Sequence, residues 1–198
     1  MKKKQIIAVS ATVFVLFSAV VVYFLYKGYT MRLPKENFVF SESGYRFSTL
    51  PYESTPEDFS RIISPIKKND AALTNPFPHE SYKTTEDVVL LYMRGTADAQ
   101  FTEDGLFAFT YTVSPLSIKE MDYTLKTLLP HYKSVFGGPT VENSPGAGQL
   151  FACWEDQKTG TALEFRMIES QKCRYILEIR AYEKWRYVEA GASEWASE

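Results

Sequence analysis

The feature that most constrains this chain is an unbroken apolar run near its N-terminus. Residues Ile6 to Tyr26 form a stretch of 21 residues without a charge or a proline. A helix rises about 1.5 Å per residue, so this run measures roughly 31 Å and matches a bilayer hydrocarbon core of about 30 Å. A cleaved secretory signal has a shorter apolar region, of roughly 7–15 residues, followed by small residues. The run therefore favours a retained anchor over a cleaved signal peptide or a buried core helix.

The charges beside this run predict its orientation. Three lysines precede it (Lys2, Lys3 and Lys4), whereas Lys27 alone follows it closely. The positive-inside bias then places the N-terminus in the cytoplasm and the rest of a single-pass cell-membrane protein outside. The expected organisation is an anchor with its cytoplasmic lysines at 1–27, a linker at 28–36, an extracytoplasmic domain at 37–189 and a polar tail at 190–198.

The composition of the remainder excludes some classes of partner. Four of the 22 basic residues precede Gly28 and none of the 24 acidic residues does, so the remainder holds 18 basic and 24 acidic residues, a net charge of −6. Nucleic-acid binding requires a basic surface, so we expect no nucleic-acid partner. Aromatic residues make up 15% of the chain, which is typical of a protein with a packed core.

Alternating apolar residues and turn residues predict several strands. Asn37–Ser41 and Tyr45–Leu50 flank a Glu-Ser-Gly turn, and Thr102–Gly105 predicts a second hairpin between Ala97–Phe101 and Leu106–Val113. Val88–Met93 is either a buried strand or a helix that begins at Thr85. Lys67–Lys83 is polar and proline-rich and is expected to be a long loop.

Two helices are predicted from their first residues. Thr55 is a natural N-cap, and Pro56 suits the first helical position that follows it. Ser117 and Glu120 form a capping box before a longer apolar face, with Pro130 expected to kink this helix and Gly137 to end it.

The last strands are predicted at 149–155, 161–169 and 172–183. With turns near Lys158 and Ser170, Cys153 lies opposite Leu163, and Leu163 lies opposite Leu177, so that one face is wholly apolar. The expected fold class is α+β: an N-terminal transmembrane helix, then an antiparallel sheet with two packed helices, arranged either as one unit or as two similar halves.

The same register separates the two cysteines. Cys153 and Cys173 fall on the outer strands of three, two strand spacings apart and offset along the strands. A disulfide requires Cα atoms within about 7 Å, so we expect two buried free thiols.

The motif order resembles a known kind of module. Ser54-Thr55-Pro56-Glu57-Asp58 opens the first helix, and the second ends in Tyr132-x-x-x-Phe136-Gly-Gly-Pro before a strand that carries Trp154. This layout resembles the helix-on-sheet modules of the outer-membrane-assembly small lipoproteins and the β-lactamase inhibitor protein, over most of residues 45–183. The resemblance implies a binding module that performs no chemistry.

The second face of the predicted sheet is the candidate binding surface. Tryptophan, tyrosine and arginine are the residue types that anchor protein interfaces. We predict that a protein or peptide partner binds there through Trp154, Arg166, Arg174, Ile176 and Tyr182. The alternative is that the N-terminal strands or the Lys67–Lys83 loop cover this face.

Residues with catalytic potential are few. His79 and His131 lack a metal-binding spacing, and no phosphate-binding or hydrolase motif occurs. We therefore expect no enzyme activity, cofactor or metal. The alternative function is an extracytoplasmic hydrolase of wall glycan that uses paired carboxylates. Glu164 and Glu178, on the open sheet face, are better placed for this than Glu103 and Asp104 in a turn, although strand alternation alone also explains them.

Overall fold

A computed structural model of the chain describes residues 37–47, 50–69, 79–143, 150–170 and 174–189, together with Ser18. The chain divides between Lys35 and Glu36 into two compact units, and everything described below belongs to the second. The side chains of Ser170, Arg174 and residues 187–189 lie outside the described part.

Eleven strands and five helical segments make up the described part of this unit. The strands are β1 (Phe38–Ser41), β2 (Gly44–Phe47), β3 (Ile66–Lys68), β4 (Glu80–Thr84), β5 (Val88–Leu90), β6 (Met93–Thr102), β7 (Gly105–Leu116), β8 (Val141–Asn143), β9 (Leu150–Asp156), β10 (Thr161–Ser170) and β11 (Arg174–Glu183). The helical segments are α2 (Pro56–Ile62), α3 (Ile118–Tyr123), the π-helix η2 (Thr124–Leu128), α4 (Leu129–Phe136) and α5 (Lys184–Glu189).

The expected fold class needs correction. The described part of the chain is mostly antiparallel sheet, with 53% strand and 23% helix. Among the residues described, no helix is both long enough and apolar enough to cross a membrane; the 19-residue helix formed by α3, η2 and α4 carries charged residues along its length. This finding for the described residues stands against the predicted single-pass anchor and the predicted cell-membrane location. Apart from Ser18, the run Ile6–Tyr26 itself lies outside the described residues.

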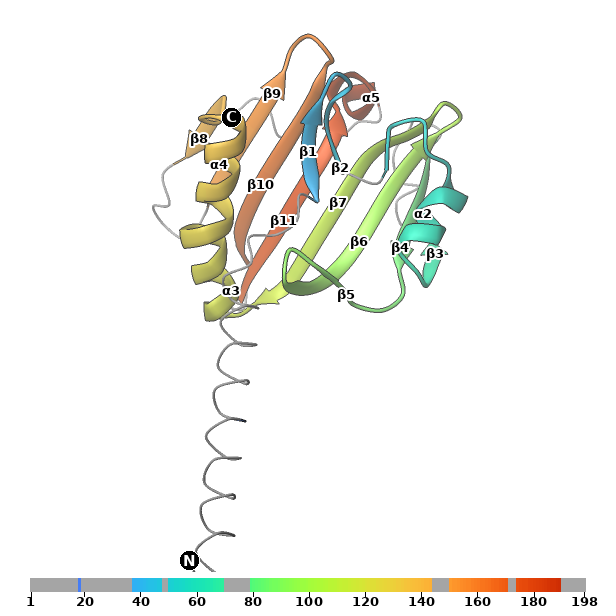
Figure 1. Ribbon diagram of the computed structural model, residues 1–198. Coiled ribbons are helices and arrows are strands. Elements are labelled where there is room, and N and C mark those ends of the chain that lie inside the picture. The colour runs from blue at the N-terminus through green and yellow to red at the C-terminus, as the bar shows by residue number, and fades with distance from the viewer. Residues whose placement is uncertain are drawn as a thin grey trace, which may run out of the picture. The chain divides into compact units, whose positions relative to one another are not determined.

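The topology of the main sheet repeats once. The strand order is β3-β4-β6-β7-β11-β10-β9-β8, with β5 paired to β6 off this path (Figure 1). In each half a helix precedes four antiparallel strands that follow one another in the sheet: α2 precedes β3, β4, β6 and β7, and the long helix precedes β8 to β11. The two halves meet where the last strand of each pairs, β7 with β11.

The helices begin where the sequence predicted. Thr55 and Asp58 form a capping box at α2 with Pro56 inside its first turn, and Ser117 and Glu120 form the box at α3. Pro130 has no N–H to donate to the carbonyl four residues back, and its ring crowds that carbonyl. The chain responds with a π-helical turn, in which the N–H of Leu129 donates to the carbonyl oxygen of Thr124.

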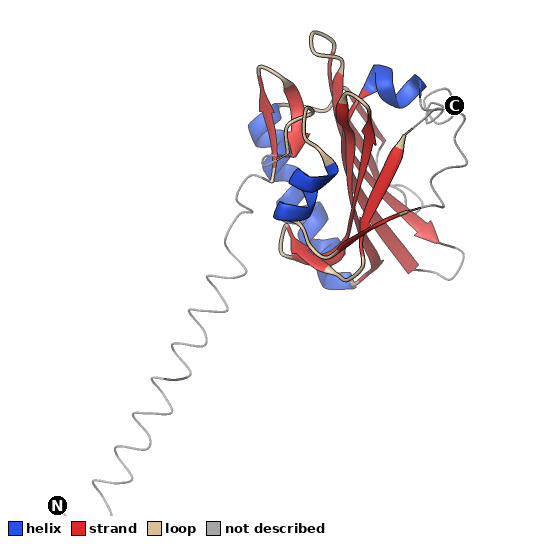
Figure 2. Cartoon of the chain, turned by 90° about the vertical axis from the view of Figure 1, so that its right-hand side faces the viewer, coloured by secondary structure: helices blue, strands red, loops and turns tan. Residues whose placement is uncertain are grey.

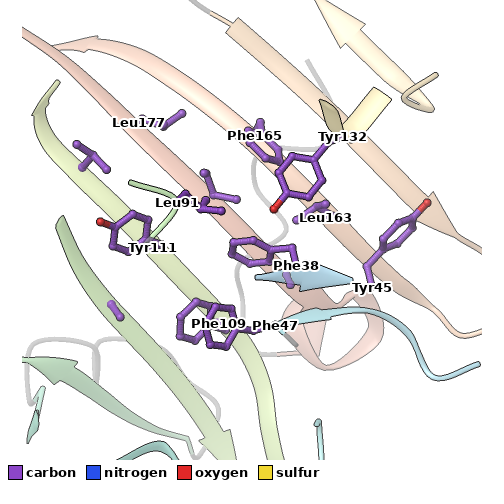
Figure 3. Close-up of a cluster of buried hydrophobic side chains, with 14 of the residues drawn as sticks. Phe38, Tyr45, Phe47, Leu91, Phe109, Tyr111, Tyr132, Leu163, Phe165 and Leu177 are labelled. Carbon is purple, nitrogen blue, oxygen red and sulfur yellow. The ribbon is translucent and has the colours of Figure 1, made fainter. Parts of the chain in front are cut away.

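α2, the long helix formed by α3, η2 and α4, and the β1–β2 hairpin cover one face of the sheet, called the core face here. Figure 3 shows rings from the hairpin and from α4 packed against strands of the sheet. Phe47 stacks on Phe109 with ring centroids 4.2 Å apart, and Tyr132 contacts Phe165 at 5.1 Å. This single layer of aromatic and aliphatic side chains is the main hydrophobic core.

Two local predictions changed in the structure. Val88–Met93 is neither one strand nor a helix: β5 and the start of β6 form a hairpin whose turn residues, Leu91 and Tyr92, both have positive φ. The predicted Lys67–Lys83 loop contains part of β3 and β4, which pair with each other, while residues 70–78 lie outside the described part.

The predicted register of the last strands is wrong at the first turn. Leu163 lies opposite Trp154, one residue from the predicted Cys153, so β9 presents its other face. Asp156 causes this: its carboxylate accepts the N–H groups of Lys158 and Thr159, and Gly160 follows with φ +68°, which builds a four-residue loop. The pairing across the second turn also differs: Leu163 pairs with Ala181, four residues from the predicted Leu177. Because the shift is an even number of residues, the side chains of β11 stay on their predicted faces.

Candidate binding face of the sheet

The face of the sheet opposite the core face is called the polar face here. One residue from each of five neighbouring strands forms a row across it. The register pairs Asp98 with Thr110, Thr110 with Arg180, Arg180 with Glu164, and Glu164 with Cys153. Directly paired residues of antiparallel strands share a face, so these five side chains form one transverse line, the polar row.

Hydrogen bonds and ion pairs connect the polar row to its neighbours. Ser81 donates its hydroxyl to the Asp98 carboxylate at 2.9 Å, and Arg180 donates from Nε to the Thr110 hydroxyl at 3.2 Å. Arg180 also forms an ion pair with Glu178 at 3.6 Å. Acidic and basic groups therefore alternate across the centre of this face.

The two carboxylates of the polar row, Asp98 and Glu164, lie in surroundings that disfavour their ionised forms. Burial raises the pKa of Asp98, against the opposing influence of the Ser81 and Asn69 hydrogen bonds. Burial also raises the pKa of Glu164, which is only 9% exposed, and nearby Arg180 and Arg166 offset this in part. Their ionised forms thus cost folding free energy.

Cys153 ends the polar row as a buried free thiol. Burial, with the nearby Glu164 and Glu155 carboxylates, raises its pKa to about 12. The thiol therefore stays protonated at neutral pH and is a poor nucleophile. Cys173 lies outside the described residues, so its burial stays a prediction.

The structure places Trp154 on the core face, against the prediction. It is 1% exposed, its ring contacts Phe136 and Phe165, and its indole N–H donates to the carbonyl oxygen of Gly137 at 2.9 Å. The one-residue difference at the β9–β10 turn accounts for this, since it exchanges Trp154 and Cys153 between the two faces.

The other predicted site residues lie on β10 and β11. Arg166 lies opposite Glu178 on the polar face, and Ile176 lies opposite Ile168. Tyr182 shares this face, and its hydroxyl donates to the Glu164 carboxylate at 3.4 Å. The side chain of Arg174 lies outside the described part. The structure thus brings Arg166, Ile176 and Tyr182 to one face, and their role in binding stays a prediction.

Asp98 and Thr110 were missed because sequence patterns do not show which distant strands pair. Asp98 did carry a local sign, since it stands between the two buried alanines Ala97 and Ala99 in an alternating strand. The predicted alternative, that N-terminal strands cover the polar face, is wrong: Phe38 and Phe47 of the β1–β2 hairpin contact Phe109 on the core face.

Glu164 and Glu178 are diagonal neighbours on β10 and β11, so the structure brings the predicted carboxylate pair together. An arginine stands beside each of them: Arg180 opposite Glu164, and Arg166 opposite Glu178. Opposite charges therefore alternate here, and Arg180 and Glu178 form an ion pair, which is unlike two carboxylates that face a substrate. The described part of the chain holds no group of three or more side chains able to bind a metal ion.

Comparison of the chain with protein-family models, with characterised proteins and with solved structures found no match.

Proposed function

We propose that this protein is a binding module whose polar face engages a protein or peptide partner, with no chemistry of its own. The observation that carries the proposal is the polar row. Buried carboxylates with raised pKa values destabilise a fold, and they recur at functional sites. Asp98 and Glu164 lie on the polar face, which contributes little to the hydrophobic core. A binding role therefore explains these two carboxylates better than a purely structural one.

The residue types around the polar row support binding over catalysis. Arg166 and Tyr182 belong to the classes enriched at interface hot spots. Neighbouring acids and bases already form pairs such as Arg180 with Glu178, so their side chains are ordered before a partner arrives. The protonated thiol of Cys153 offers no nucleophile.

Site-specific photocrosslinking tests the proposal. A photoreactive amino acid replaces Thr112 on the polar face, and in a matched control it replaces Ile118, which is 79% exposed at the start of α3. We expect a discrete adduct from position 112 that is absent from position 118 and is lost in an Arg166→Glu background. Identical adducts from both positions, or none from position 112, would contradict the proposal.

A glycan hydrolase is the second candidate function, and one observation favours it. The raised pKa of Glu164 suits a general acid, and Glu178 is its nearest carboxylate across the strand pair. Release of reducing ends from a polymeric glycan, abolished in Glu164→Gln, would support this function. No release by the unmodified protein would exclude that substrate class.

A further inference from the structure

We propose that the partner presents an acidic segment to the polar face, and that its carboxylates dock on Lys67 and Lys83 at the β3–β4 side of the sheet (Figure 1). This inference rests on the proposed function and names the chemistry of the partner. The feature that carries it is a pair of lysines that lie directly opposite each other on this face.

The strand register places both lysines on the polar face. Lys67 of β3 pairs with Lys83 of β4, and Lys83 pairs with Asp98 of β6. Directly paired residues share a face, so the two lysines continue the line of the polar row beyond Asp98. Figure 2 shows the sheet from its β3–β4 side, with α2 and the long helix on one side of the strands and the polar face on the other. Lys67 is exposed and Lys83 is half-buried, so a partner on this face can contact both.

The lysine pair is unfavourable for the fold on its own. Like charges directly opposite each other on antiparallel strands repel. Within the described part of the chain neither lysine forms an ion pair, whereas Lys68, on the other face of β3, pairs with Glu80. Asp98, opposite Lys83, offsets the repulsion only in part, because burial raises the pKa of this carboxyl. A carboxylate supplied by a partner would relieve the repulsion that remains.

Protection of a sheet edge does not explain the pair. Lysines on edge strands hinder unwanted pairing with other chains, which would account for Lys67 on β3. Lys83, however, lies on β4, which pairs with β3 on one side and with β6 on the other. It therefore protects no edge, and an acidic partner explains its charge better.

The charge of the whole polar face favours an acidic partner. The chain after Gly28 carries a net charge of −6. Among the described side chains, the register and the alternation of the strands place five bases and four acids on the polar face, a net charge of +1: Lys67, Lys83, Arg94, Arg166 and Arg180 against Asp98, Glu155, Glu164 and Glu178. Complementary charge steers encounter and suppresses wrong orientations, so an acidic segment would be directed to this face of an otherwise acidic protein.

Affinity measurements test the acidic segment. The partner is the protein captured from position 112 and identified by mass spectrometry, and it is purified and titrated against the unmodified chain and three double variants. In the first variant Lys67 and Lys83 are both replaced by glutamine, and in the second both are replaced by arginine. The matched control is Lys119→Gln with Lys126→Gln, which removes two exposed lysines from the long helix on the other side of the sheet. Circular dichroism and urea unfolding confirm that each variant is folded.

We expect the glutamine variant at positions 67 and 83 to bind about tenfold more weakly at about 50 mM NaCl, and this loss to shrink at about 500 mM, where salt screens exposed charges. The arginine variant keeps both charges and should bind within about threefold of the unmodified chain. The control should bind within about twofold, because its lysines lie away from the polar face.

The possible failures are distinguishable. Capture from position 112 combined with unchanged or tighter binding of the glutamine variant overturns the acidic segment and leaves the proposed function standing. Capture of nothing from position 112 overturns both. Equal losses in the glutamine variant and the control also overturn the acidic segment, since the effect would then depend on the total charge of the protein and not on this face.

Discussion

The two faces of the sheet differ although the same strands build them. On β7, Phe109 and Tyr111 point into the aromatic core while Thr110, between them, belongs to the polar row. On β10, Leu163 and Phe165 are core residues while Glu164 lies on the polar face. Successive side chains of a strand therefore alternate between a core face, which stabilises the fold, and a polar face, whose buried carboxylates destabilise it.

This difference predicts opposite responses to mutation. Truncation on the core face removes buried apolar contacts and leaves a cavity, so it should destabilise strongly. Removing a buried carboxylate on the polar face relieves a desolvation cost, so it should destabilise little or not at all. The following three experiments test this contrast.

Trp154→Ala should have the largest effect. The change empties a site enclosed by Phe136 and Phe165 and removes the hydrogen bond to Gly137, and we expect a loss of about 3–5 kcal/mol in the free energy of unfolding. Urea denaturation measures it. Thr112→Ala on the polar face is the matched control, with an expected loss below about 1 kcal/mol. A Trp154→Ala protein with full stability would mean that the two faces are wrongly assigned.

Tyr111→Phe should have an intermediate effect. The Tyr111 hydroxyl donates to the carbonyl oxygen of Met93 at 2.6 Å and lies 3.2 Å from that of Val88, so it joins the β5–β6 hairpin to the core. Its removal leaves buried carbonyl groups without this donor, at a cost of about 1–2 kcal/mol. Hydrogen exchange should also accelerate at the amides of β5. Exchange that accelerates uniformly across the sheet would show that the hydroxyl does not act locally.

Glu164→Gln should have the smallest effect, below about 1 kcal/mol at neutral pH, and should change the pH dependence of stability. Burial raises the native pKa of Glu164 above its unfolded value of 4.5, against Arg180 and Arg166, while Glu178 adds to the rise. The native state thus binds this proton more tightly, and the stabilisation is complete below the unfolded pKa and is lost as the pH rises through the native pKa.

Unfolding free energies from pH 4 to pH 8 measure this effect. Relative to Glu164→Gln, the unmodified protein should lose stability as the pH rises. Glu103→Gln, in the exposed β6–β7 turn, serves as the control and should follow the unmodified protein. If the unmodified protein gained on Glu164→Gln with rising pH, the neighbouring arginines would outweigh burial, and the polar row would be a stabilising feature.

Local chemistry made much of the fold predictable. The capping boxes at Thr55 and Ser117 satisfy helix N–H groups with side chains a few residues away, and the turn at Glu103 and Asp104 closes a hairpin between adjacent strands. Each of these depends on neighbours in the chain, and each was confirmed. The candidate site was less predictable: Arg166, Ile176 and Tyr182 were placed on the correct face, whereas Trp154 was not.

The sequence by itself determined where the two capped helices begin, and which residues of β10 and β11 share a face, because these follow from capping chemistry and a period of two. Only the tertiary structure decided that β7 pairs with β11, which brings Asp98 and Thr110 beside Arg180 and Glu164. It also decided the face of β9, where the carboxylate of Asp156 and the left-handed Gly160 fix the length of one loop. A period of two makes a strand's face depend on a single residue in its turn, and partners distant in the chain leave no local pattern.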